Sequence, residues 1–271
     1  MVASSFSSVC RQMKQSIIIP AYNEAKRIGA TLQSLVEYAK EGGLEANAFE
    51  VIVVCDGCRD NTESVAGGFE GQLPLRVVSY PANQGKGYAV KHGISLSSGD
   101  IVMFMDADGS TPVRELSRLS GPVRLGYADI VVGSRRVKGA KLAVRQPLLR
   151  QLLGHLFSLH TFLVLGIRVL DTQCGFKVFR GSVARELFPQ LRSHGFVFDL
   201  DVLAMAEERH LRVLERGVEW RDVGGSTVHP LRDGVRMLRG AWQIRSRLQR
   251  HRRIKAQEAE AELMLTSCRA D

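Results

Sequence analysis

Two aspartates, Asp106 and Asp108, stand one residue apart directly after the apolar run 101–105. Like charges at the end of a buried strand repel each other unless a positive group lies beside them. Carboxylate oxygens suit Mg²⁺ or Mn²⁺, which also bind the phosphate oxygens of substrates. The alternative for a D-x-D pattern taken alone is an aspartate that caps the following helix. We favour the metal site because other candidate ligand-binding residues occupy equivalent places along the chain.

One of these places is the glycine-rich segment 83–87, where Lys86 stands between Gly85 and Gly87. Its spacing differs from that of the P-loop of nucleotide-binding proteins. The glycines leave backbone N–H groups accessible near the start of a predicted helix, and the lysine adds a positive charge. The segment therefore suits an anionic ligand, although an ordinary surface loop with an exposed lysine is the alternative.

Apolar runs alternate with helical patterns in the first half of the chain. They predict strands at 15–20, 49–57, 75–80, 100–108 and 128–135. The segment 23–40 predicts a helix, and Thr111–Pro112 should begin the helix that follows the fourth strand. This alternation predicts an α/β fold with a mostly parallel sheet flanked by helices. Ligands bind outside the carboxyl ends of such strands, where the candidate residues fall.

The second half carries a strongly basic segment. Residues 232–255 contain nine Lys/Arg and one acid, a net charge of +8, whereas the whole chain has +9. The remainder is therefore close to neutral (9 − 8 = +1). This is not the broad basic face of a nucleic-acid-binding protein, and we expect no nucleic-acid partner. It suits an anionic membrane surface.

Other segments of this half give weaker signals. The apolar segment 148–170 is interrupted by charged and histidine residues, so we expect a buried or amphipathic helix and no membrane span. Residues 198–209 predict a helix, 211–223 a strand or hairpin, and 235–255 a basic helix followed by a frayed polar tail. The five scattered cysteines and the lack of a secretory signal indicate reduced thiols and a cytoplasmic location.

Five segments, in this order and at these intervals, resemble the inverting family 2 glycosyltransferases of GT-A fold: SIIIPAYNEAKRI, VIVVCDGCRDNT, NQGKGYAVKHGI, FMDADGSTP and DTQCGFKVFR. Within that family the chain is most similar to dolichyl-phosphate β-glucosyltransferases and polyprenyl-phosphate sugar synthases, over about residues 16–247. The resemblance implies a GT-A, Rossmann-like domain at 16–231. Its nucleotide-sugar half would be 16–136 and its acceptor half 137–231. A disordered segment 1–15 would precede it, and a basic amphipathic helix and tail, 232–271, would follow.

The resemblance also implies roles on the donor side. The residues that would line the nucleotide-sugar pocket are Pro20, Ala21, Tyr22, Glu24, Asp56, Lys86, Asp106 and Ala107. Asp56 would accept from the uracil N3–H, and Lys86 would face the diphosphate. Asp106 and Asp108 would hold the metal, with Ser110 as a further metal-side ligand. Cys55 and Cys58 depart from the family pattern, in which two aspartates are followed by Gly-Ser.

On the acceptor side, Arg135, Arg136 and Arg145 would bind the phosphate of a polyprenyl phosphate. That phosphate is already anionic near neutral pH, so the demand for a general base is modest. A base, if one is needed, would be Asp171 or Asp199, and the sequence does not choose between them.

The resemblance therefore implies transfer of a hexose, with glucose favoured, from UDP-glucose to a polyprenyl or dolichyl monophosphate, with Mg²⁺ or Mn²⁺ as cofactor. A mannose synthase that uses GDP-mannose and transfer to a non-lipid acceptor are the alternatives. Nucleotidyl transfer is disfavoured because PAYNE stands where a glycine-rich loop would follow the first strand. A non-enzymatic nucleotide-binding module would need neither Asp108 nor an acceptor half. We expect a peripheral membrane enzyme and allow for a homodimer.

Overall fold

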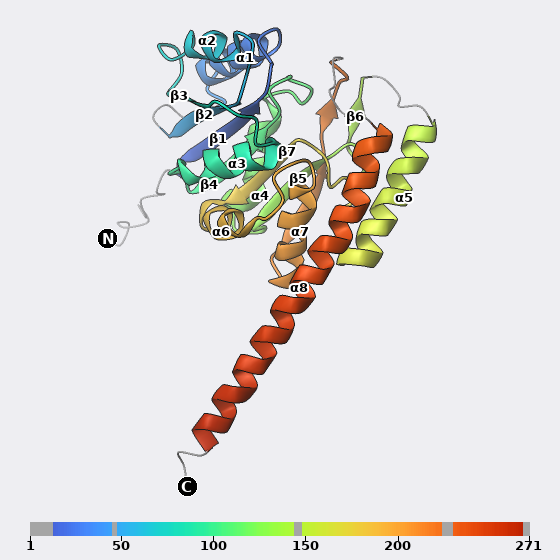
Figure 1. Cartoon of the computed structure of the whole chain (residues 1–271). Helices are drawn as coiled ribbons and strands as arrows, with labels where there is room; N and C mark the ends of the chain where they lie inside the picture. Colours follow the sequence, from blue (N-terminus) through green and yellow to red (C-terminus); the bar gives the residue numbers. More distant parts are fainter. Residues whose placement is uncertain (1–12, 45–47, 144–147, 224–229, 268–271) are drawn as a thin grey trace, which may run out of the picture.

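A seven-stranded sheet forms the centre of the protein (Figure 1). The computed structural model describes residues 13–44, 48–143, 148–223 and 230–267. The strands of this sheet follow the order β3-β2-β1-β4-β7-β5-β8. They are β1 (Gln15–Ala21), β2 (Phe49–Asp56), β3 (Leu75–Tyr80), β4 (Ile101–Met105), β5 (Ile130–Ser134), β7 (Phe176–Arg180) and β8 (Val213–Gly217). A second sheet pairs β6 (Lys141–Leu142) with β9 (Glu219–Trp220).

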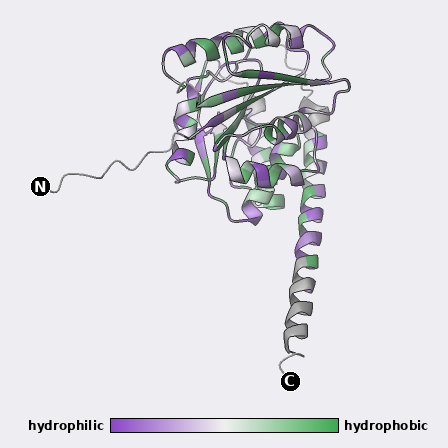
Figure 2. Cartoon of the chain, turned by 90° about the vertical axis from the view of Figure 1, so that its left-hand side faces the viewer, coloured by the Kyte–Doolittle hydropathy of each residue, from purple (hydrophilic) through white to green (hydrophobic). Residues whose placement is uncertain are grey.

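The predicted α/β fold with a mostly parallel sheet is confirmed. Strands β1 to β4 are parallel, as are β5 and β8, and β7 lies antiparallel between β4 and β5. β1 and β4 are buried along their whole lengths because helices cover both faces. Figure 2 shows the hydrophobic colour concentrated along these central strands.

The helices form two layers, one on each face of the sheet. One layer consists of α1 (Ile28–Lys40), α2 (Thr62–Gly67) and α4 (Glu115–Arg124), which pack on strand residues such as Ile17 and Val51. The other layer packs on the alternate strand residues, such as Ile18 and Phe104. It consists of α3 (Lys86–Ser95), α5 (Leu148–Leu165), α6 (Gly181–Leu187), the 3₁₀ turn η1 (Phe188–Gln190), α7 (Phe198–Glu208) and α8 (Pro230–Ser267). Successive side chains along each strand therefore point to opposite faces of the sheet and pack in two separate hydrophobic cores.

Of three further local predictions, two were wrong and one was confirmed in one of its alternatives. Helix α4 begins at Glu115, so Pro112 lies in a turn ahead of it and not in its first turn. The segment 211–223, predicted as a strand or hairpin, contains the strand β8 of the large sheet and the short strand β9, which joins β6, so the strand alternative is confirmed. The segment after residue 255 continues as helix to Ser267, where a frayed tail was expected.

Helices α5 and α8 lie side by side, and the C-terminal half of α8 extends away from the domain (Figure 1). Arg245 of α8 donates to the carbonyl of Val164 at 2.9 Å, and Ile244 is buried against the core. The outer face of α5 is apolar and exposed. It carries Leu152, Leu153, Leu156, Leu159, Phe162 and Leu163, each at least half exposed. Among the described residues, neither α5 nor any other helix combines the length and apolar character needed to cross a bilayer.

Candidate functional site

A pocket of about 450 Å³ opens at the carboxyl ends of β1, β2 and β4. Its lining includes all eight residues predicted to bind the nucleotide sugar: Pro20, Ala21, Tyr22, Glu24, Asp56, Lys86, Asp106 and Ala107. Asp108 lines it as well. The parallel strand order explains this gathering, because β1 lies between β2 and β4 and all three end at the same edge.

Asp56 fixes the loop that carries Lys86. Its Oδ1 accepts from the backbone N–H of Gln84 at 2.7 Å, and its Oδ2 accepts from the N–H of Gly85 at 2.9 Å. The side-chain amide of Asn83 donates to the same Oδ2 at 2.9 Å. Gly57 allows this approach, since its φ is +65° and a Cβ there would lie 2.4 Å from the backbone nitrogen of Asn83. A carboxylate has about four acceptor positions, so Asp56 keeps one for a ligand N–H.

Lys86 and Asp106 form an ion pair inside the pocket. The Nζ of Lys86 lies 2.6 Å from Oδ1 of Asp106, and the lysine side chain is 20% exposed. Burial acts to lower the pKa of Lys86, but the carboxylates of Asp106 and Asp199 outweigh it and leave that pKa raised. Lys86 therefore stays positively charged at neutral pH, which suits an anionic group in the pocket.

The carboxylates of the pocket create a negative region that a cation would stabilise. Burial, together with repulsion from Asp106 and Asp108, raises the pKa of Glu24, although Arg27 opposes this by ion pairing at 2.5 Å. One oxygen of Asp108 accepts from the backbone N–H of Ser110 at 2.9 Å, so Asp108 retains acceptor capacity. Ser110 is buried and does not line the pocket.

The donor set fits a magnesium or manganese ion that is completed by its substrate. Among the residues that the structure describes, no group of three or more His, Cys, Asp or Glu could hold a metal by itself. Mg²⁺ commonly binds through one or two carboxylates plus substrate phosphates and water. Asp108 and Asp106 meet this requirement, and the remaining ligands would come from the diphosphate.

Asp171 and Arg135, predicted as a base and an acceptor ligand, bind each other. The guanidinium of Arg135 donates from Nε and from an Nη, each at 2.7 Å, to the two oxygens of Asp171. Asp171 is 2% exposed. Burial would raise its pKa, but the hydrogen bonds and charge of Arg135 hold that pKa below the usual range. Neither side chain lines the pocket, and Arg135 also lies over the ring of Trp220 at 5.4 Å.

Arg136 also has hydrogen-bond partners within the protein. It donates to the carbonyl of Gly154 at 2.6 Å and to the hydroxyl of Ser158 at 2.8 Å, which ties the end of β5 to α5. Arg145 lies outside the described residues. The structure therefore gives Arg135 and Arg136 existing partners, and their role toward an acceptor stays a prediction.

Asp199, the other predicted base, pairs with a lysine that the sequence analysis missed. The Nζ of Lys177 lies 2.5 Å from Oδ1 of Asp199 and donates to the carbonyl of Cys174 at 2.7 Å. Both side chains are almost fully buried, and burial raises the pKa of Asp199 despite Lys177. Asp199 does not line the pocket, so its assignment as a base also stays a prediction.

The pocket also contains residues that the sequence analysis did not name. These are Arg27, Asn83, Ala89, Gly195 and Phe196. Asn83 begins the glycine-rich segment 83–87, whose Gly85 was named and also lines the pocket, so the motif could have indicated it. Gly195 and Phe196 follow η1, about 90 residues after the D-x-D pair, and only the tertiary fold brings them there.

The sheet order, the pocket at the carboxyl ends and the D-x-D pair are typical of an α/β protein of the glycosyltransferase type. The model of the family "Glycosyl transferase family 2" matches residues 16–188, and the chain belongs to that family.

The curated relatives of this chain are glycosyltransferases as well. A dolichyl-phosphate beta-glucosyltransferase of Trichomonas vaginalis is 38% identical over 78% of this chain and 65% of its own, so this chain spans just under two thirds of that relative. The protein of the same description from Drosophila melanogaster is 34% identical over 86% of this chain and 78% of its own. The one from Homo sapiens is 31% identical over 84% and 77%, respectively.

Solved structures share the fold. Glucosyl-3-phosphoglycerate synthase from Mycobacterium tuberculosis, solved with Mn²⁺, UDP-glucose and phosphoglyceric acid, superposes with a TM-score of 0.62. It is 21% identical, and the match covers 86% of this chain and 80% of that one. At this identity the likeness concerns the fold, which confirms the GT-A-like architecture expected from the motifs.

Proposed function

We propose that this protein transfers glucose, with inversion, from UDP-glucose to a dolichyl or other polyprenyl monophosphate, with Mg²⁺ or Mn²⁺ as cofactor. The observation that carries the proposal is a single pocket that combines Asp56, Lys86 and the pair Asp106/Asp108 at the edge of the sheet. Relatives described as dolichyl-phosphate beta-glucosyltransferases support the sugar and the acceptor.

The pocket provides for the two ends of a nucleotide diphosphate. Asp56 accepts the N3–H of uracil with its remaining acceptor position, at the end of the pocket formed by β2. Lys86 meets the diphosphate near β4. Asp108 and Asp106 would hold the divalent ion, which would supply positive charge to the leaving diphosphate.

The acceptor brings its own nucleophile. A phosphate monoester oxygen is ionised near neutral pH, so attack on the sugar C1 requires no proton removal. This fits the ion pairs in which Asp171 and Asp199 take part. Arg135, Arg136 and Arg145 are the proposed ligands of the acceptor phosphate. The first two would exchange some of their present hydrogen bonds for the ligand.

The lipid chain of the acceptor would reach the enzyme from a bilayer. The apolar outer face of α5 and the arginine-rich α8 beside it form a surface suited to an anionic cytoplasmic leaflet. We therefore propose a peripheral membrane protein that acts at the cytoplasmic side. Flotation with liposomes at low and high salt tests this, and absence of flotation at every salt concentration rejects it.

A donor screen tests the catalytic proposal. The protein is incubated with Mg²⁺ or Mn²⁺, a polyprenyl phosphate in detergent, and radiolabelled UDP-glucose, UDP-GlcNAc, UDP-galactose or GDP-mannose in turn. We expect label in the lipid phase from UDP-glucose alone, lost in Asp108→Asn and kept in Glu70→Gln, which changes an exposed acid outside the pocket. Transfer from GDP-mannose instead would replace the donor assignment. Release of free sugar without lipid product would exclude the lipid acceptor.

A further inference from the structure

The segment 191–197, between η1 and α7, forms one wall of the donor pocket. Gly195 and Phe196 line the pocket. The carbonyl of His194 accepts from the backbone N–H of Tyr88 at 3.2 Å. A Cβ at Gly85 would lie 2.7 Å from that same carbonyl oxygen. The wall therefore contacts the loop that holds Lys86 directly, and a shift of the wall would displace this loop.

The wall is fixed by a buried carboxylate of α7. Asp201 has no exposed surface, and its Oδ2 accepts from the backbone N–H groups of Arg192 at 3.2 Å and Ser193 at 3.3 Å. These bonds hold the beginning of the segment. A buried carboxylate requires compensation for its charge, and two neutral donors supply only part of it.

The compensating charge comes from α8. Arg247 donates with one Nη to Oδ2 of Asp201 at 3.1 Å and with the other to Oδ1. The same helix also contacts the end of the segment, since a Cβ at Gly240 would lie 2.5 Å from a methyl group of Val197. Helix α8, whose outer surface faces away from the sheet, thus holds the pocket wall at both of its ends.

We propose that Arg247 is a positioning residue for the nucleotide-sugar site, which acts through Asp201 on the wall 191–197. Its fork of two donors fixes the carboxylate, the carboxylate fixes the N–H groups of Arg192 and Ser193, and the wall keeps its place against the Lys86 loop. The consequence is that the affinity for the donor depends on a helix that does not touch the donor. This inference rests on the proposed function, because it takes UDP-glucose as the donor that binds in the pocket.

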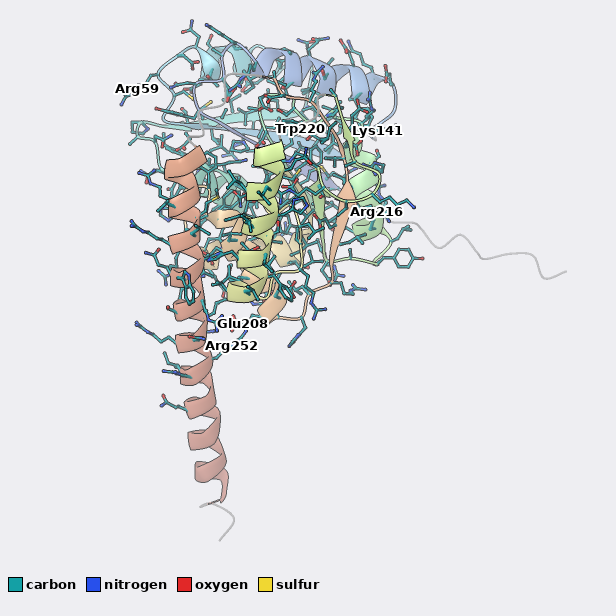
Figure 3. All side chains as sticks on the ribbon, turned by 90° about the vertical axis from the view of Figure 1, so that its right-hand side faces the viewer. Arg59, Lys141, Glu208, Arg216, Trp220 and Arg252 are labelled. Atoms are coloured by element: carbon teal, nitrogen blue, oxygen red, sulfur yellow. The ribbon has the colours of Figure 1, made fainter. Side chains whose placement is uncertain are left out.

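Arg247→Gln tests the inference, with Arg252→Gln as a matched control. Arg252 also joins α8 to α7, by an ion pair to Glu208 at 2.9 Å (Figure 3), but Glu208 is the last residue of α7, whereas Asp201 lies in its first turn. For Arg247→Gln we expect the KM for UDP-glucose to rise about five- to tenfold with kcat within about twofold, a typical size for coupling between distant groups. Arg252→Gln should leave both constants unchanged. Arg247→Lys should recover part of the affinity, because it restores the charge but not the fork.

Hydrogen exchange of the enzyme without donor gives a second readout. We expect faster exchange of the Arg192 and Ser193 amides in Arg247→Gln than in the wild type, and no change in Arg252→Gln. If Arg247→Gln is too unstable to purify, Asp201→Asn provides the same comparison and should also accelerate exchange at these amides. Unchanged exchange, or equal KM increases in both arginine variants, would overturn the inference. If the wild type binds no UDP-glucose, the proposed function fails, and the exchange experiment still decides whether Arg247 fixes the wall.

Discussion

The ammonium group of Lys86 lies 2.6 Å from Oδ1 of Asp106, so an ion pair joins the glycine-rich loop to the end of β4 inside the donor pocket. The pair joins the loop to the segment that carries the two aspartates, where the proposed diphosphate would lie. It also keeps two like charges, Asp106 and Asp108, beside a cation. This arrangement of one cation and two carboxylates suits the proposed ligand, a nucleotide diphosphate with its divalent ion.

Replacement of Lys86 by Gln should lower kcat/KM for sugar transfer by about 100-fold, because the diphosphate loses a preorganised positive charge as it departs. Asp106 also loses its partner, which adds to the repulsion with Asp108. Steady-state kinetics with varied donor provide the measurement. Lys91→Gln is the control: Lys91 lies on the same helix, α3, but donates to the carbonyl of Pro189 at 2.9 Å, outside the pocket. Equal losses in the two variants would argue against a role for Lys86 at the diphosphate.

Replacement of Asp56 by Ala should weaken both donor binding and folding. Three hydrogen bonds to Asn83, Gln84 and Gly85 are lost, and each is worth about 1 kcal/mol, so the free energy of unfolding should fall by about 2–3 kcal/mol. Urea unfolding measures this change, and titration with UDP measures affinity. Asp56→Asn should fall between Ala and the wild type, because the amide keeps one acceptor oxygen. Unchanged UDP affinity in both variants would reject Asp56 as the residue that binds the base.

Replacement of Arg135 by Gln should lower the free energy of unfolding by about 3 kcal/mol at pH 7, because it leaves the buried carboxylate of Asp171 without its cation. Arg135 holds the folded pKa of Asp171 below its unfolded value of about 3.9. The stabilisation is therefore present above about pH 4 and is lost as the pH falls through the folded pKa. We expect the difference between wild type and variant to shrink as urea unfolding is repeated at decreasing pH.

Arg216→Gln serves as the control for this measurement. Arg216 is an exposed arginine on the neighbouring strand β8 (Figure 3), and its loss should change the free energy of unfolding by less than about 0.5 kcal/mol at every pH. A difference for Arg135→Gln that stays constant from pH 7 to pH 3 would show that its cause is packing, for example against Trp220, and not the charge of Asp171.

Charges placed on the outer face of α5 should detach the protein from membranes. Leu156 and Phe162 are 54% and 50% exposed, so Leu156→Glu with Phe162→Glu should leave the fold intact and abolish flotation with anionic liposomes. The matched control is Leu125→Glu with Tyr127→Glu, which alters two exposed apolar side chains in the turn between α4 and β5. Equal loss of flotation in both double variants would mean that added negative charge, and not the α5 face, governs the interaction.

The sequence predicted the donor half of this protein well because its signals are local. Strands β1, β2 and β4 are apolar runs that end beside pocket residues, and parallel strands place their carboxyl ends at one edge. The eight predicted donor-site residues therefore line one pocket. The motifs around Asp56 and Lys86 could be placed at the same edge without knowledge of the strand order, because each follows the carboxyl end of a strand in a mostly parallel sheet.

The acceptor half was less predictable because its contacts join distant segments. Strand β7 lies antiparallel between β4 and β5. Lys177 of this strand is buried and pairs with Asp199, and Asp171, which precedes the strand, pairs with Arg135. No periodicity in the sequence distinguishes a carboxylate that pairs with a buried cation from one that faces a ligand.

The amino-acid sequence by itself therefore determined the family, the succession of strands and helices in the first half and eight residues that line one pocket, since these depend on local patterns of hydrophobicity and motif spacing. Only the tertiary structure decided which charges neutralise each other and which segments close the pocket. Lys177 and Asp199 are 22 residues apart in the chain, and Asp201 and Arg247 are 46 residues apart. Such contacts form because burial of a charge requires an opposite charge at hydrogen-bond distance, and packing, not sequence proximity, determines which group that is.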